Sequence, residues 1–254
     1  LSQAVKIDIE KVPLDDKKTY EMLARGETFG VFQLNGSGMT KYLIELKPEK
    51  MFDIMAMIAL YRPGPIDSIP DYIKRKHNNK AVRHLDPRMK EILSMSYGII
   101  TFQDDVLLIA INIAGYTWEE ADKLRKAMGK KIPEEMAKQK EKFIQGAIEK
   151  GNLSPELADK LFKLIEPFAA YGFNKAHAAS YAHISYYTAY LKANYPVEYM
   201  AAVMTAESGD IEKIGEAIKE CQRMGQTMVE ELRRLLAGEV MAYEITEERA
   251  KFLA

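Results

Sequence analysis

The 254-residue sequence has little of several features that would point to a definite class of protein. It has one cysteine, Cys221, which excludes a disulfide framework and fits a reducing, cytoplasmic setting. No uninterrupted apolar run is long enough to cross a membrane, so no membrane partner is expected. The formal net charge of −1 provides no whole-chain attraction for nucleic acid, and any basic surface must be local.

Motifs for catalysis and metal binding are also missing. The sequence has no P-loop, no Rossmann glycine pattern, no Gly-x-Ser-x-Gly and no His/Cys metal constellation. The adjacent acids Asp104 and Asp105 suit a helix cap and a first-turn acid better than a metal site. We therefore expect no catalytic residue and no bound metal in this chain. The start at Leu1, with neither Met nor a signal-peptide pattern, suggests a fragment of a longer protein.

What the sequence does contain is a succession of helical patterns. Capping residues, apolar spacing and proline or glycine stops predict helices at 16–24, 37–46, 51–61, 105–114, 118–129, 133–151, 155–167, 175–195, 196–207 and 211–224. Asp15 or Asp16 can cap the first of these helices, and Thr117 to Glu120 form a capping box at the start of the helix at 118–129. Two further helical stretches, 226–237 and 246–254, are expected to close the chain, and short strands are expected at 29–34 and 97–103. The predicted fold class is mainly α, a multi-helix domain with a few short β-strands.

One stretch, from Tyr171 to Tyr181, places cations at the beginning of a helix. Asn174 is a good helix N-cap, so Lys175 and His177 fall in the first turn, where the helix dipole favours anions. Cations are reasonable there if an anion such as phosphate also binds. The alternative is a solvated lysine and a histidine packed under a neighbouring loop.

A second group of cations lies in Leu124–Lys131. The apolar stripe of this helix leaves Arg125, Lys126 and Lys130 on the exposed side. Asp122 can pair with Arg125 and Lys126 at i+3 and i+4, which is a purely structural explanation. The functional alternative is a grip on a polyphosphate, in which Arg supplies a fork and Lys a point charge.

Two other segments carry weaker signals. The turn Arg62-Pro63-Gly64-Pro65 projects Arg62, although such a turn is ordinary loop punctuation. The basic segment 74–88, which begins with Lys74, Arg75 and Lys76, can follow a nucleic-acid backbone or form a solvated surface.

In this order the segments resemble the fingers region of the C-family replicative polymerases of bacteria, the DNA polymerase III alpha subunits. The stretches that carry the resemblance are Pro13–Tyr20, Gly30–Leu34, Ala59–Pro65, Tyr97–Ile100, Leu124–Lys131, Tyr171–His177 and Glu198–Met204. Each motif alone is weak, but the ordered set is specific and covers roughly residues 8–225. On this basis residues 1–28 are expected to be a lead-in helix and connector, 29–225 the fingers domain, and 226–254 a helical tail.

The resemblance implies a cytoplasmic bacterial DNA-directed DNA polymerase whose fingers close over the nascent base pair. Its partners would be primer–template DNA, the incoming dNTP and other replicative holoenzyme subunits. The triphosphate would be bound by Arg125, Lys126 and Lys130. The nascent base pair and primer–template would be contacted by Asn174, Lys175, His177, Ser180, Tyr181 and Arg62, and the DNA backbone by Lys74, Arg75 and Lys76.

The sequence departs from the family pattern in four places. The palm aspartates that hold Mg²⁺ in two-metal phosphoryl transfer have no counterpart here, so the chain alone is expected to be inactive. Lys126 replaces the second Arg of the cation pair, which removes a bidentate fork. Asp104-Asp105 replaces a more usual Glu-Gln. After Gly225 the family's Pro-Pro-Asp segment is replaced by the helical 226–254, which suggests a fusion, an insertion or omitted residues.

Two alternatives to a polymerase fingers module follow from the same residues. The first is a helical nucleic-acid-binding domain without a nucleotide site, which would use the basic surfaces 74–88 and 123–142. The second is a helical scaffold whose tail docks on a partner protein through the apolar residues Met228, Leu232, Leu235 and Leu236.

Overall fold

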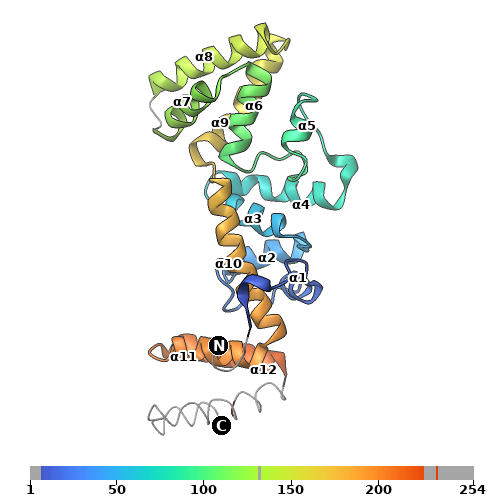
Figure 1. The fold of residues 1–254 in the computed structure, drawn as a ribbon, viewed down its shortest axis with the longest axis vertical. Helices are drawn as coiled ribbons and strands as arrows, with labels where there is room; N and C mark the ends of the chain where they lie inside the picture. Colours follow the sequence, from blue (N-terminus) through green and yellow to red (C-terminus); the bar gives the residue numbers. More distant parts are fainter. Residues whose placement is uncertain (1–6, 131–132, 226–232, 234–254) are drawn as a thin grey trace. The chain divides into compact units, whose positions relative to one another are not determined.

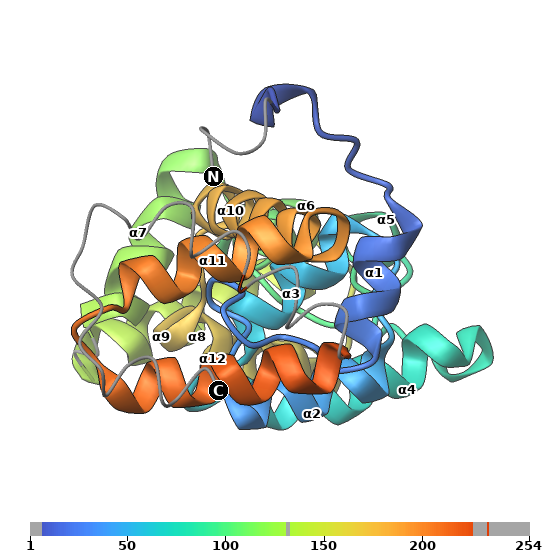
Figure 2. The ribbon, with the colours of Figure 1, turned by 90° about the horizontal axis from the view of Figure 1, so that it is seen from below.

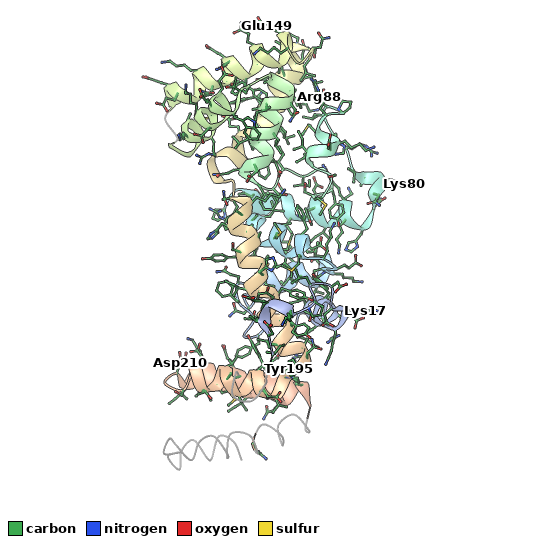
Figure 3. The ribbon with its side chains drawn as sticks, in the orientation of Figure 1. Lys17, Lys80, Arg88, Glu149, Tyr195 and Asp210 are labelled. Carbon is green, nitrogen blue, oxygen red and sulfur yellow. The ribbon has the colours of Figure 1, made fainter. Side chains whose placement is uncertain are left out.

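The computed structural model describes residues 7–130, 133–225 and 233, and these are mainly helical (Figure 1; side chains in Figure 3). The α-helices are α1 (Lys17–Ala24), α2 (Ser37–Leu46), α3 (Met51–Leu60), α4 (Ile69–His77), α5 (Met89–Ile92), α6 (Gln103–Ala114), α7 (Trp118–Lys130), α8 (Pro133–Glu149), α9 (Pro155–Tyr171), α10 (Lys175–Asn194), α11 (Pro196–Ala206) and α12 (Ile211–Met224). The 3-10 helices are η1 (Ile9–Lys11), η2 (Pro65–Ser68) and η3 (Asn79–Ala81). The predicted mainly α class is confirmed.

Local capping chemistry explains why most helices begin where the sequence predicts. The carboxylate of Asp16 accepts a hydrogen bond of 2.9 Å from the backbone N–H of Thr19 at the start of α1. Thr117 and Glu120 exchange side-chain to backbone bonds of 2.9 and 3.2 Å, which form the predicted capping box of α7. One expected end is wrong, because α9 continues beyond 167 to Tyr171.

The strand predicted at 29–34 is wrong. Gln33 has a φ of +60° and Gly30 a φ of +74°, and these left-handed residues turn the chain where a strand would continue. Val31 and Leu34 close successive turns through their backbone N–H groups, and both side chains are fully buried. The apolar run therefore reflects burial of a loop, which sequence periodicity alone does not distinguish from a short buried strand.

The second predicted strand, 97–103, is wrong for a similar reason. Tyr97 and Gly98 have φ values of +55° and +78°, so the segment begins with a left-handed turn. The part of the chain that the structure describes has a single isolated β-bridge, between Phe102 and Phe173, and no longer ladder. The few short strands of the predicted fold class are thus absent from the described residues.

The chain divides into two compact units. One comprises Leu1–Met51 together with His183–Ala254, and the other comprises Phe52–Ala182. The domain limits that the sequence predicts, 1–28 and 29–225, stay a prediction. The predicted helical tail, 226–254, lies outside the described residues.

In the first unit, α11 and α12 lie side by side, as Figures 1 and 2 show from two directions. Tyr199, Met200 and Met204 of α11 pack with Ala217 and Cys221 of α12 in one buried apolar cluster. The α12 helix presents apolar residues to this cluster and charged residues to solvent, so burial of one face stabilises the pair.

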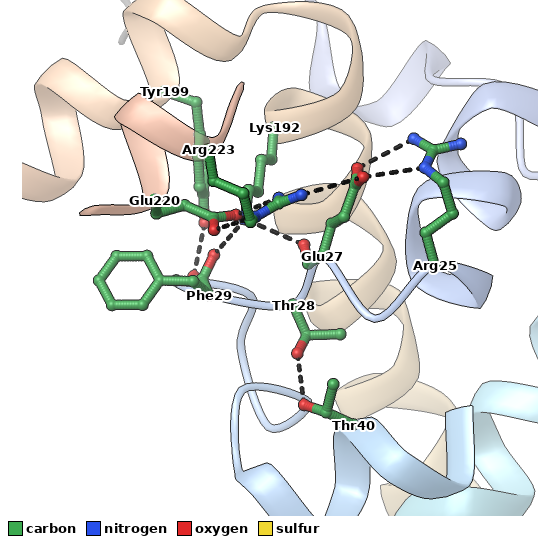
Figure 4. Close-up of polar contacts among 10 residues, drawn as sticks. Arg25, Glu27, Thr28, Phe29, Thr40, Lys192, Tyr199, Glu220 and Arg223 are labelled. Atoms are coloured by element: carbon green, nitrogen blue, oxygen red, sulfur yellow. Dashed lines mark hydrogen bonds and ion pairs between the residues drawn. The ribbon is translucent and has the colours of Figure 1, made fainter. Parts of the chain in front are cut away.

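A buried network of charges joins three segments of the first unit (Figure 4). The ammonium group of Lys192, whose side chain is fully buried, donates to the carbonyl oxygens of Glu27 and Phe29 at 2.9 and 2.8 Å. It also forms an ion pair of 2.6 Å with Glu220, which in turn accepts from Arg223 at 2.8 Å. Because each buried charge has a partner, the network satisfies the condition for burying ions at all.

In the second unit, α6, α7, α8 and α9 form a small bundle. Its aromatic core includes Tyr116, Phe143 and Phe162, with ring centroids 6.2 Å apart for the first two and 5.5 Å for the last two.

The fold prediction missed α4, although Ile69, Tyr72 and Ile73 have helical spacing and are buried. The basic residues that follow them are typical of a solvated surface segment, and the apolar spacing before them is short, so no helix was predicted here.

Candidate functional site

At the beginning of α10, two side chains that are not part of the helix accept hydrogen bonds from its first backbone N–H groups. The side chain of Asn174 accepts a hydrogen bond of 2.9 Å from the backbone N–H of His177, so the predicted N-cap is confirmed. The backbone N–H of Lys175 donates to the carboxylate of Asp104 at 3.2 Å. An anion therefore does lie at the start of this helix, as the dipole favours, but it is a carboxylate of the chain itself.

A row of planar side chains extends from the turn after α3 onto α10. The guanidinium of Arg62 lies over the ring of Phe173 at 4.9 Å. The rings of Phe173 and His177 follow at 5.0 Å, and those of His177 and Tyr181 at 4.2 Å with 38° between their planes. The structure thus brings together three predicted residues, Arg62, His177 and Tyr181, which are far apart in the sequence or on successive turns.

The other predicted residues of α10 have partners close by. The hydroxyl of Ser180 donates to the backbone carbonyl of Ala176 at 3.0 Å, within its own helix. The ammonium group of Lys175 lies 5.9 Å from the ring centroid of Phe102, the N-cap residue of α6. Lys175 is exposed, and its charge favours ionisation of the nearby Asp105.

The expectation that Asp104 caps a helix beginning at Asp105 is wrong, because α6 begins at Gln103 with Phe102 as its N-cap residue, and Asp105 is the third residue of the helix. The buried carboxylate of Asp105 accepts from the backbone N–H groups of Thr101 at 2.8 Å and Phe102 at 2.9 Å. Burial raises the pKa of Asp105 to about 6, although the bonds from Phe102 and Thr101 favour the ionised form. Asp104 is consequently available to α10.

The cations predicted to bind a triphosphate lie on α7. Arg125 donates to one oxygen of Asp122 at 2.6 and 3.0 Å, and Lys126 pairs with the other oxygen at 2.6 Å. These bonds from Lys126 and Arg125 lower the pKa of Asp122. Both cations remain accessible, with side chains 37% and 61% exposed. The side chain of Lys130 lies outside the part of the structure that is described.

The three cations predicted to contact a DNA backbone differ in their surroundings. Lys74 is exposed. Arg75 donates to the carbonyl oxygen of Gly98 at 3.0 Å, and Lys76 forms an ion pair of 3.1 Å with Asp53 in which its side chain is only 4% exposed. Arg75 and Lys76 are thus engaged within the fold, and Lys74 alone faces solvent freely enough to meet a phosphate.

Sequence reasoning missed Phe173 and the role of Asp104. Phe173 precedes His177 and Tyr181 at spacings of four, so the row could have been extended backwards from the helix. The contact of Phe173 with Arg62, and that of Asp104 with Lys175, join residues far apart in the chain and leave no local pattern.

Two classes of feature have no representative among the residues that the structure describes. No three His, Cys, Asp or Glu side chains come close enough together to hold a metal ion. No helix combines the length and the apolar character needed to span a bilayer.

Comparison with known proteins relates this geometry to a family. The family model for the bacterial DNA polymerase III alpha subunit finger domain matches residues 1–151. The DNA polymerase III subunit alpha of Thermus aquaticus is 48% identical over 229 residues, which cover 88% of this chain and 19% of that protein. The subunits of Pasteurella multocida and Escherichia coli K12 are 50% and 49% identical over 226 residues, covering 86% of this chain and 19% of each. The chain therefore spans about a fifth of the length of these relatives.

Proposed function

The chain belongs to the family of the bacterial DNA polymerase III alpha subunit finger domain, and from this premise we propose that it binds the incoming dNTP and the nascent base pair. The observation that carries the proposal is the row of planar groups from Arg62 through Phe173 and His177 to Tyr181. Planar side chains offer stacking surfaces to bases without selecting a sequence, which a replicative polymerase requires.

The triphosphate contacts are assigned to α7. Arg125 and Lys126 are two accessible cations on a single carboxylate, that of Asp122, so one unit of positive charge is uncompensated there. A triphosphate carries more charge than Asp122 and can accept the fork of Arg125 and the point charge of Lys126. In this proposal the phosphate oxygens replace Asp122 as the partners of these two cations, with Lys130 as the third contact.

At the start of α10 the proposal assigns side chains to the base pair and primer–template, with Lys175, Asn174 and Ser180 beside His177 and Tyr181. The DNA-backbone contact is assigned to Lys74, because Arg75 and Lys76 have partners inside the fold. These assignments use the exposed atoms of the described surface. They require no change in the buried ion pair of Lys76.

Chemistry is assigned to the longer protein. We propose that it is a cytoplasmic DNA-directed DNA polymerase acting with other replicative subunits, and that Mg²⁺ is held by residues outside this chain. The isolated chain is then predicted to be inactive in nucleotide incorporation. Its contribution would be binding and orientation of the substrate, which can supply a large part of a rate enhancement.

The test is made in the complete polymerase with a matched pair of lysine variants. Lys126→Ala removes a cation paired with Asp122 four residues earlier, and Lys163→Ala removes one paired with Asp159 in the same way. Their side chains are 61% and 64% exposed. Loss of one charge-assisted phosphate contact should raise the dNTP KM about tenfold or more for Lys126→Ala, with no change for Lys163→Ala.

The outcome also separates the competing function. A helical domain that binds nucleic acid without a nucleotide site would show steeply salt-dependent DNA binding that dNTP does not affect. If each of the single variants Lys126→Ala, Arg125→Ala and His177→Ala has an unchanged dNTP KM, the proposed function is overturned and that alternative is favoured.

A further inference from the structure

The first turns of α6 and α10 are joined to each other by backbone and side-chain hydrogen bonds. Both belong to the same compact unit, and Figure 1 shows the start of α6 beside the junction of α9 and α10. The residues that form the bonds across this junction are Gln103 and Asp104 on one side and Phe173 and Lys175 on the other. Asp104 and Asp105 have no role in the binding surfaces proposed above.

Asp105 defines the shape of the α6 side of the junction. One of its carboxylate oxygens accepts from the backbone N–H groups of both Thr101 and Phe102, and the residue is 5% exposed. Two bonds to one buried oxygen hold the backbone just before α6 in a single arrangement. The edge of this segment is thereby presented to the turn that precedes α10.

The next contact is between backbones. The N–H of Gln103 donates to the carbonyl oxygen of Phe173 at 3.1 Å, and Phe102 and Phe173 form the isolated parallel bridge. The φ of Gly172, −59°, would suit any residue, so the reason for glycine is steric. A Cβ at this position would clash with the carbonyl oxygen of Phe168 in the last turn of α9 and would also lie 2.7 Å from Cγ of Gln103 across the junction.

The last contact reaches the first residue of α10. The carboxylate of Asp104 accepts from the backbone N–H of Lys175 at 3.2 Å, one of the N–H groups that a helix start leaves without an internal partner. Lys175 lies between two members of the row of planar groups. His177 is two residues after it in α10, and Phe173, whose ring contacts the guanidinium of Arg62, is two residues before it. Asp104 therefore holds the midpoint of the segment that carries the row.

We propose that Asp104 is a positioning residue for the row of planar groups that is proposed to bind the nascent base pair. By anchoring the start of α10 to the start of α6, it sets the positions of Phe173 and His177. The inference rests on the proposed function, because it gives a kinetic meaning to the position of the row. In this proposal the anion at the start of α10 is the carboxylate of Asp104. The phosphates of the substrate are then bound by side chains on α7, not by the α10 terminus.

The test uses three substitutions in the complete polymerase. Asp104→Ala removes the acceptor, whereas Asp104→Asn keeps an acceptor oxygen and removes only the charge. Glu212→Ala is the matched control, because Glu212 is likewise the second residue of its helix, is exposed, and accepts no hydrogen bond from another element among the residues that the structure describes. The readouts are kcat and KM for the correct dNTP, Kd for primer–template, and thermal unfolding.

A positioning role predicts a specific pattern of results. Asp104→Ala should lower kcat/KM for the correct dNTP about tenfold, with unchanged primer–template Kd, since a small misplacement of a substrate-contacting group has a large kinetic effect. Asp104→Asn should recover most of this loss, and Glu212→Ala should match the unsubstituted enzyme. Gly172→Ala, which opens the same junction without changing charge, should reproduce the defect of Asp104→Ala.

Two results would overturn the inference. The first is a normal kcat/KM in Asp104→Ala, which together with a lower unfolding temperature would indicate a purely structural role. The second is an equal loss in Asp104→Asn and Asp104→Ala, because charge and not position would then be responsible. The proposed function is tested separately by Lys126→Ala, so a raised dNTP KM there with normal Asp104→Ala kinetics would reject only the positioning role.

Discussion

Two carboxylates, one in each unit, are withdrawn from solvent and yet have pKa values shifted in opposite directions. Burial raises the pKa of Asp105 in α6 to about 6. Burial also acts to raise the pKa of Glu220 in α12, but hydrogen bonds from Arg223 and Lys192 outweigh it and lower the pKa to about 2. Asp105 is buried, whereas Glu220 is half-buried, so Asp105 also loses more of its hydration.

The hydrogen-bond donors of the two carboxylates differ as well. Asp105 is bonded by the neutral backbone N–H groups of Thr101 and Phe102, which only partly replace the water that the carboxylate loses. Glu220 is bonded by the cations of Lys192 and Arg223, whose charges favour its ionised form in addition. The first unit thus uses a buried charge network to join its segments. The second uses a single carboxylate to shape a backbone turn near the candidate site.

The largest expected effect comes from breaking the network in the first unit. Lys192→Met leaves the largely buried Glu220 without its nearest cation and leaves two carbonyl oxygens without a donor. Removal of one partner of a buried ion pair typically costs about 3–5 kcal/mol of unfolding free energy, measurable by chemical denaturation at pH 7. Lys213→Met, which breaks the exposed pair with Glu207, is the control and should have little effect.

A double variant sharpens this prediction. Lys192→Met combined with Glu220→Gln removes both charges of this ion pair, so its loss of stability should be smaller than the sum of the two single losses. Additive losses in the double variant would show that the two charges do not depend on each other and would contradict the network.

The second effect is the pH dependence of Asp105. Its pKa is raised from 3.8 to about 6 in the folded chain, so the folded state binds the proton more tightly than the unfolded state. The stabilisation from this proton is present below pH 3.8 and is lost as the pH rises through 6. Asp105→Asn removes the titration. Its stability relative to the unsubstituted chain should therefore increase between pH 4 and pH 7, by about 3 kcal/mol at 1.36 kcal/mol per pKa unit.

Glu220→Gln is the matched control, with the opposite sign. The pKa of Glu220 is lowered from 4.5 to about 2, so its stabilisation is present above pH 4.5 and is lost as the pH falls towards 2. The deficit of Glu220→Gln should therefore grow as the pH rises from 2 to 4.5. A pH dependence of the same sign in both variants, measured by denaturation at several pH values, would refute the comparison.

The two carboxylates also show how far sequence reasoning extends. Local patterns predicted that Asp15 or Asp16 caps α1, and the structure shows that it is Asp16. They also predicted the cap Asn174 and the reciprocal pair of Thr117 and Glu120, because each partner lies within three residues. Helix starts are therefore largely predictable. The strands at 29–34 and 97–103 were not, since left-handed residues such as Gln33 and the burial of loops outweigh apolar periodicity.

Partners distant in sequence account for the remainder. Lys76 was interpreted as a surface cation because its partner Asp53 is on another helix, and burial of the pair depends on how α3 and α4 pack. Arg62 could be nominated from its rigid turn, but its contact with Phe173 could not. Sequence reasoning predicted some residues of the candidate site, such as Arg62, His177 and Tyr181, but not Phe173. The anchoring by Asp104 required the folded chain.

The smallest effect on stability is expected at the exposed carboxylate that pairs with the α7 cations. Asp122→Asn weakens two solvent-exposed ion pairs, which contribute little to folding, so thermal unfolding should be unchanged within error. Asp159→Asn is its control, since Asp159 likewise pairs with two exposed cations, Lys140 and Lys163. In the complete polymerase the two variants should differ: Asp122→Asn releases Arg125 and Lys126 for phosphate and should lower the dNTP KM, whereas Asp159→Asn should leave it unchanged. A dNTP KM that does not respond to Asp122→Asn would mean that this carboxylate does not compete with the triphosphate for the two cations.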